Sequence, residues 1–123
     1  MADAILTEIQ KEIAENVILV YGKGTKEMPR CGFTLETIEF FKRFGYEFTI
    51  IDVLDNMPKR EALSQMTNWQ TLPKVFIGGT FYGDTDILEP MDESGELATV
   101  LKTAFGGKGP APTDGNVIKL RAT

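Results

Sequence analysis

The chain has 123 residues, a formal net charge of −5, 42% hydrophobic residues and 25% charged residues, a balance typical of one globular domain. The acidic charge argues against general binding to nucleic acid or to anionic membranes, since both depend on a basic surface. One cysteine excludes an intrachain disulfide, and the absence of histidine excludes a Cys-His catalytic pair or a histidine-ligated zinc site. Without a membrane-length apolar run or a secretory signal, we expect a cytoplasmic protein in a reducing compartment.

The first two predicted elements are a helix and a strand. Residues 4–15 have the apolar spacing of an amphipathic helix. The short, β-branched apolar run at 17–21 predicts a strand buried on both faces. The loop that follows, 22–25, lacks the spacing of a phosphate-binding P-loop. Within it, Lys23 is either an ordinary surface lysine or a residue that faces an anionic ligand.

Cys31 lies where this strand leads into a helix predicted over 32–45. The spacing predicts an apolar face formed by Leu35, Ile38, Phe41 and Phe44, and an opposite polar face formed by Glu36, Thr37, Glu39, Lys42 and Arg43. At the first turn of a helix, free backbone N–H groups and the macrodipole favour a thiolate. Basic residues are also close in sequence: Lys23, Lys26 and Arg30. We therefore favour a reactive or metal-binding thiolate over a buried structural cysteine.

The run at 47–53 predicts a second strand, which completes a right-handed parallel βαβ unit. Functional groups in such units lie beyond the carboxyl ends of the strands, so the 22–31 loop should lie at the functional edge. Residues 55–58 begin a further helix whose buried side is predicted to be Ala62, Leu63 and Met66. Arg60, early in this helix, points either to solvent or to a ligand, and the sequence favours neither.

Residues 74–77 and 80–82 flank Gly78-Gly79, which predicts a β-hairpin. Pro73 is either a device of an edge strand or part of a cis Leu72–Pro73 bond. A cis bond would leave the Leu72 backbone free to pair with a bound peptide. Thr85 or Asp86 is expected to cap a helical region that continues to Phe105.

Four motifs occur in register: Lys23-Gly24-Thr25, Pro29-Arg30-Cys31-Gly32-Phe33-Thr34, Asn68-Trp69-Gln70-Thr71-Leu72-Pro73 and Gly83-Asp84-Thr85-Asp86. With them the chain resembles, over residues 4–105, the single-domain monothiol glutaredoxins with a CGFS-like active site. The resemblance implies a thioredoxin-like α/β fold, with a four-stranded mixed sheet flanked by helices on both faces. The domain would span residues 1–105, and the Gly- and Pro-rich stretch 106–123 would be a flexible tail.

The resemblance also implies glutathione as a cofactor, bound by Lys23, Cys31, Phe33, Arg60, Thr71, Leu72, Pro73, Thr85 and Asp86. Cys31 would be the nucleophile or the metal ligand. Lys23 and Arg60 would pair with the glycine-end carboxylate, and the Leu72 backbone would bind the cysteinyl part. Thr85 and Asp86 would hold the γ-glutamyl end, with Asp86 facing its ammonium. Phe33 and Thr71 would line the groove, with Trp69 nearby.

Three positions depart from the family pattern: Thr34 replaces serine, Gln70 replaces proline, and Asp84 replaces glycine. The first should be mild because the hydroxyl is kept, and the second should loosen its loop. The third adds a carboxylate where the γ-glutamyl group would lie. If Asp84 points inward, it should weaken glutathione binding.

The leading hypothesis is a homodimer that holds a [2Fe-2S] cluster with one cysteine per protomer and two glutathiones. It would pass the cluster to iron–sulfur acceptor proteins and contribute to cluster assembly and redox homeostasis. The alternative is a glutathione-dependent thiol–disulfide oxidoreductase that acts through Cys31 on glutathionylated proteins. A third hypothesis is a regulatory module that pairs with a BolA-like protein.

Overall fold

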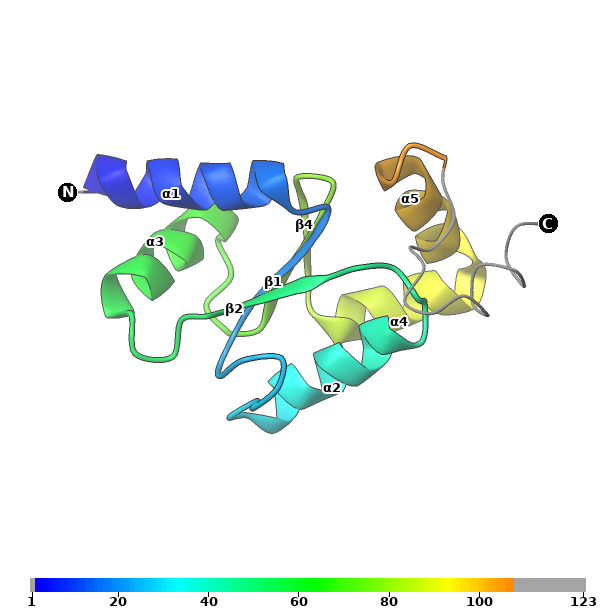
Figure 1. Cartoon of the computed structure of the whole chain (residues 1–123), viewed down its shortest axis with the longest axis horizontal. Helices are drawn as coiled ribbons and strands as arrows, with labels where there is room; N and C mark the ends of the chain where they lie inside the picture. Colours follow the sequence, from blue (N-terminus) through cyan, green and yellow to red (C-terminus); the bar gives the residue numbers. More distant parts are fainter. Residues whose placement is uncertain (1, 108–123) are drawn as a thin grey trace.

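The computed structural model describes residues 2–107 (Figure 1). In chain order its elements are α1 (Ala2–Glu15), β1 (Ile18–Gly22), α2 (Gly32–Lys42), β2 (Thr49–Asp52), α3 (Met57–Thr67), β3 (Lys74–Ile77), β4 (Thr80–Gly83), α4 (Thr85–Ser94) and α5 (Glu96–Ala104). Gly95, with φ 87°, separates α4 from α5. Apart from Gly106 and Gly107, the predicted tail over 106–123 lies outside the described residues.

The four strands form one mixed sheet, as predicted, and their order in it is β2-β1-β3-β4. β1 and β2 are parallel and are joined through α2, whereas β3 is antiparallel to both β1 and β4. The hairpin turn has Gly78 at φ 58° and Gly79 at φ 85°, the left-handed pair that a two-residue hairpin loop favours. The carboxyl ends of β1, β2 and β4 therefore share one edge of the sheet with the amino end of β3.

β1 is buried on both faces, as predicted, because helices cover both sides of the sheet (Figure 1). Ile18 and Val20 face a core that α2, α4 and α5 complete. Leu19 and Tyr21 face a second core that α1 and α3 complete. Because successive strand residues point to opposite faces, only an uninterrupted apolar run can fill both cores.

α2 is shorter than the predicted helix over 32–45, and its buried face is rotated. Leu35, predicted to face the core, is 47% exposed, whereas Thr37, predicted to face solvent, is fully buried. The Thr37 hydroxyl donates to the Phe33 carbonyl over 2.9 Å. Burial of threonine is tolerated because this bond satisfies its polar group.

α3 begins as predicted, with Pro58 in its first turn and Asn56 as the N-cap that accepts from the Lys59 amide. Its buried face was predicted incorrectly at one position, because Met66 is 41% exposed. Lys59 is buried in addition to Leu63, at 4% and 0% exposure. The helix therefore packs through a charged side chain that hydrophobic periodicity could not identify.

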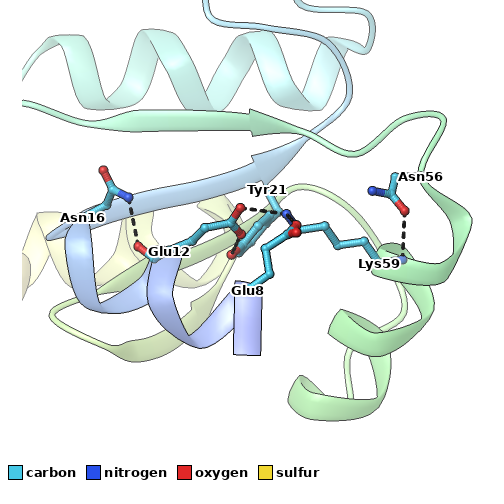
Figure 2. A network of polar contacts seen from close by, with 6 residues as sticks. All are labelled: Glu8, Glu12, Asn16, Tyr21, Asn56 and Lys59. Carbon is cyan, nitrogen blue, oxygen red and sulfur yellow. Dashed lines mark hydrogen bonds and ion pairs between the residues drawn. The ribbon is translucent and has the colours of Figure 1, made fainter. Parts of the chain in front are cut away.

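A polar network makes the burial of Lys59 possible (Figure 2). The Lys59 ammonium binds Glu8, and it binds Glu12 over 2.8 Å. The Tyr21 hydroxyl donates to the other carboxylate oxygen of Glu12 over 2.7 Å. Burial alone would lower the pKa of Lys59, but the bonds and charges of Glu12 and Glu8 raise it. The network joins α1, α3 and β1 on one face of the sheet.

None of the helices over residues 2–107 combines the length and the apolar character that crossing a bilayer requires.

Candidate functional site

A groove of about 490 Å³ lies at the sheet edge where β1, β2 and β4 end. Its lining residues come from separate segments of the chain: Lys23, Cys31, Phe33, Arg60, Gln70, Thr71, Leu72, Asp84 and Asp86. The parallel-strand rule applied to the 22–31 loop thus located the groove correctly.

Cys31 is the N-cap residue of α2, in an extended conformation, and is only partly buried. Burial raises the pKa of its thiol, but the backbone amides of Thr34 and Phe33, the Lys23 charge and the Thr34 hydroxyl outweigh it. The net result is a lowered pKa. Gly32 leaves open space at the start of α2, since a Cβ added there would meet no residue beyond its chain neighbours within 4 Å. Cys31 is therefore an accessible cysteine that favours the thiolate.

Thr34 joins the start of α2 to the end of β1. Its hydroxyl accepts from the Lys23 amide over 3.1 Å, and its side chain is fully buried. A Cβ at Gly22 would lie 3.0 Å from the Thr34 methyl carbon. Glycine at this strand end therefore makes room for threonine where the family pattern has serine.

Asp52, which the sequence interpretation missed, fixes the loop that carries Lys23 and the loop whose Leu54 carbonyl binds Arg60. One of its carboxylate oxygens accepts from the Gly24 amide and the Leu54 amide, each over 2.9 Å. These two donors hold the pKa of Asp52 below its usual value. An aspartate that directly ends a strand was the available signal, because such residues often bind nearby loop amides.

The two basic residues line the groove together. The Arg60 guanidinium donates to the Leu54 carbonyl over 3.0 Å, which orients this half-buried side chain along the groove. Lys23 lies close enough to Cys31 to favour its thiolate. Both residues thus line the groove, and that they face a ligand there stays a prediction.

The end of β4, at the other side of the groove, supplies the acidic residues Asp84 and Asp86. The N-cap of α4 is Asp84, not Thr85 or Asp86 as predicted: its carboxylate accepts from the Asp86 amide over 3.0 Å. Its φ of −140° is extended backbone, and Gly83 takes the positive φ of 87°. Thr85 is buried with its hydroxyl on Glu36 over 2.9 Å, so its side chain does not line the groove.

The segment before β3 forms one wall. The Leu72–Pro73 bond is cis, the alternative that was expected to leave the Leu72 backbone free to pair with a bound peptide. Pro73 itself is buried behind the wall, and Gln70, Thr71 and Leu72 line it. Trp69 does not line the groove, because its ring packs edge-on against Phe81 with 5.9 Å between centroids.

The comparisons with known proteins match this arrangement. Residues 18–82, more than half of the chain, match the Glutaredoxin family. The chain belongs to the glutaredoxin family. Its single cysteine makes it a monothiol member, and this agrees with relatives that carry that description. Probable monothiol glutaredoxin 2 of Rickettsia typhi is 37% identical over 102 residues, covering 83% of this chain and 92% of the relative. Glutaredoxin 4 of Escherichia coli K12 is 36% identical over 97 residues, covering 79% and 84%.

Solved structures confirm the predicted thioredoxin-like fold of this glutaredoxin. Reduced apo GrxS14 of poplar is 30% identical, with a TM-score of 0.74 over 82% of this chain and 93% of that one. A buckwheat glutaredoxin, solved as a complex with glutathione, has a TM-score of 0.77 at 24% identity. It covers 89% of this chain and 96% of its own, and at this identity it supports the fold alone.

Proposed function

We propose that this monothiol glutaredoxin binds glutathione in the groove beside Cys31 and carries a [2Fe-2S] cluster between two protomers. It would deliver the cluster to iron–sulfur acceptor proteins in the reducing cytoplasm. The observation that carries the proposal is the accessible Cys31, with a lowered pKa, in a groove that has basic residues at one edge and acidic residues at the other.

The residues of the groove suit a zwitterionic tripeptide. Lys23 and Arg60 attract a carboxylate, while Asp86 attracts an ammonium. Leu72 forms no backbone hydrogen bond within residues 2–107, so its N–H and C=O are available to an extended peptide. Asp84 is the one residue that opposes this fit, because it occupies the Asp86 amide.

The cluster is cargo for which the chain supplies one thiolate. Residues 2–107 contain no group of three or more His, Cys, Asp or Glu side chains that could hold a metal ion. A [2Fe-2S] cluster takes four thiolates, so two Cys31 side chains and two glutathiones complete the set. Exposed apolar side chains close to Cys31 in the chain offer contact surface for the second protomer: Met28 at 63% and Phe33 at 68% exposure.

Anaerobic reconstitution with iron, sulfide and glutathione tests this function. We expect visible charge-transfer absorption and a shift from monomer to dimer on gel filtration, both dependent on glutathione. Cys31→Ser should remain a colourless monomer. A wild-type protein that stays colourless, or a Cys31→Ser variant that still takes up the cluster, would contradict the proposal. The same experiment with a BolA-like protein added tests whether such a partner replaces one protomer.

A second candidate is glutathione-dependent reduction of mixed disulfides, favoured by the partial exposure and lowered pKa of Cys31. Cys31 takes the glutathionyl group from a protein mixed disulfide and releases the protein thiol. It then gives the group to a second glutathione as glutathione disulfide, so the sulfur oxidation states balance. Turnover of a glutathionylated peptide with excess glutathione tests this activity. If the protein without a cluster shows no turnover, cluster transfer remains as the proposed function and the reductase activity is excluded.

A further inference from the structure

Lys74, the first residue of β3, is a buried lysine that has no acidic partner within residues 2–107. Its side chain is 1% exposed, and its ammonium donates to the Thr71 carbonyl over 3.0 Å and to the Trp69 carbonyl. Lysines are almost never fully buried unless they are paired. Burial is the one cause that lowers the pKa of Lys74, to about 8. Because burial disfavours the charged ammonium, we expect the hydrogen bonds that it makes to have a structural role.

What Lys74 holds is one wall of the groove. The two carbonyls that it binds flank Gln70, and Gln70, Thr71 and Leu72 are consecutive lining residues. This segment belongs to neither α3 nor β3, so regular backbone hydrogen bonding does not fix it. The Thr67 hydroxyl gives only a long second contact to Trp69, at 3.4 Å. Because the Trp69 and Thr71 carbonyls bind Lys74, the Leu72 backbone remains available to a ligand.

We propose that Lys74 is a positioning residue: its ammonium fixes segment 69–72 so that the groove is preformed for a peptide thiol bound beside Cys31. The inference rests on the proposed glutathione site and deepens it. Without the ammonium, the Trp69 and Thr71 carbonyls would lose a buried donor, and the segment would have to reorganise before binding.

The proposal predicts a pH response in the wall itself. When Lys74 loses its proton, the charge-assisted bonds become neutral ones of roughly half the strength, so the wall loosens as the pH rises through about 8. Tyr21 is the register partner of Lys74 on β1, and Glu12 and Lys59 lie beyond the Tyr21 hydroxyl. Burial and Glu12 raise the pKa of Tyr21, so it keeps its proton across this range.

Trp69 provides the readout, because it is the only tryptophan in the chain and its carbonyl is bound by Lys74. We compare Cys31→Ser with Cys31→Ser/Lys74→Met, so that the thiol does not titrate. Between pH 6.5 and 9.5, Trp69 emission should change with a midpoint near 8 in the first protein and not in the second. A flat emission profile for Cys31→Ser, or the same midpoint in Cys31→Ser/Lys74→Met, would overturn the proposal. If Lys74→Met does not fold, the profile of Cys31→Ser alone decides.

Calorimetric titration with S-methylglutathione on proteins that retain Cys31 tests the effect on binding. At pH 6.5, Lys74→Met should raise the Kd about fivefold, the effect of one net hydrogen bond. The ratio to wild type should shrink at pH 9. Lys102→Met, on an exposed lysine of α5, should change neither value. Equal Kd values for Lys74→Met and wild type would refute the positioning role. If no protein binds the ligand while the emission titration persists, the glutathione site fails and the role of Lys74 in holding the wall stands.

Discussion

Asp84 changes the acidic end of the groove through a single side chain. Its carboxylate takes the Asp86 amide at the start of α4, where backbone N–H groups would otherwise favour an anion. It also adds a second negative charge beside Asp86. The α-carboxylate of a γ-glutamyl group placed here would meet an occupied donor and two like charges.

We therefore expect Asp84→Gly to bind glutathione about five- to tenfold more tightly, from one freed donor and one fewer repulsive charge. Glycine costs an N-cap only a few tenths of a kcal/mol relative to aspartate, so the variant should fold. Asp84→Asn keeps a capping oxygen without the charge and should give an intermediate Kd. Calorimetry measures all three proteins, and a weaker Asp84→Gly complex would show that Asp84 assists binding.

At the scale of elements, the network of Lys59, Glu8, Glu12 and Tyr21 holds α1 and α3 together on the sheet (Figure 2). The Lys59 side chain is 6% exposed, whereas Glu12 and Glu8 are 21% and 57% exposed. Removing the cation would leave Glu12 partly buried and without its counter-charge. The full penalty for breaking a buried ion pair is reduced here because solvent reaches both carboxylates.

Lys59→Met should lower the free energy of unfolding by about 1–2 kcal/mol, measured by urea denaturation at pH 7. Lys11→Met, on the exposed face of α1, is the matched control and should stay within about 0.5 kcal/mol of wild type. Because the network does not line the groove, glutathione affinity should be unchanged in both. An unaltered unfolding free energy for Lys59→Met would mean that apolar packing alone holds α1 in place.

Hydrophobic periodicity predicts local features of these elements but not the burial of polar side chains. The apolar run of β1 and the Gly78-Gly79 turn are local signals, and both were predicted correctly from the sequence. Thr37 and Lys59 were not predicted as buried, because their burial depends on the Phe33 carbonyl and on two glutamates of another helix. Polar partners leave no hydrophobic pattern, whether they lie four residues away, as for Thr37, or in another helix, as for Lys59.

At the scale of the whole molecule, the order of the strands explains which residues of the groove could be predicted from the sequence. Cys31 and Lys23 flank one strand-to-helix junction, so their meeting was predictable without the family resemblance. The bonds of Asp84 and Lys74 are local contacts, over two to five residues. The burial of Lys74, however, comes from the packing around β3 in the assembled sheet, and the motifs alone could not supply it.

The proposed dimer would depend on a local exception to the acidic character of the chain. Each protomer carries a net charge of −5, so two of them repel each other overall. The loop before Cys31 is basic, through Lys23, Lys26 and Arg30, and it exposes 63% of Met28. Dimerisation through this face would bury apolar surface where the repulsion is least.

Met28→Asp should therefore weaken the cluster-bound dimer about tenfold or more, because it places a charge in a surface that association dehydrates. Sedimentation of reconstituted protein over a dilution series measures the dimer–monomer midpoint. Met66→Asp is the matched control, since Met66 is 41% exposed on α3 but does not line the groove. Both variants should bind glutathione like wild type, because neither residue contacts the groove. If Met28→Asp dimerises normally, the protomers meet through another face, and the basic loop serves the ligand alone.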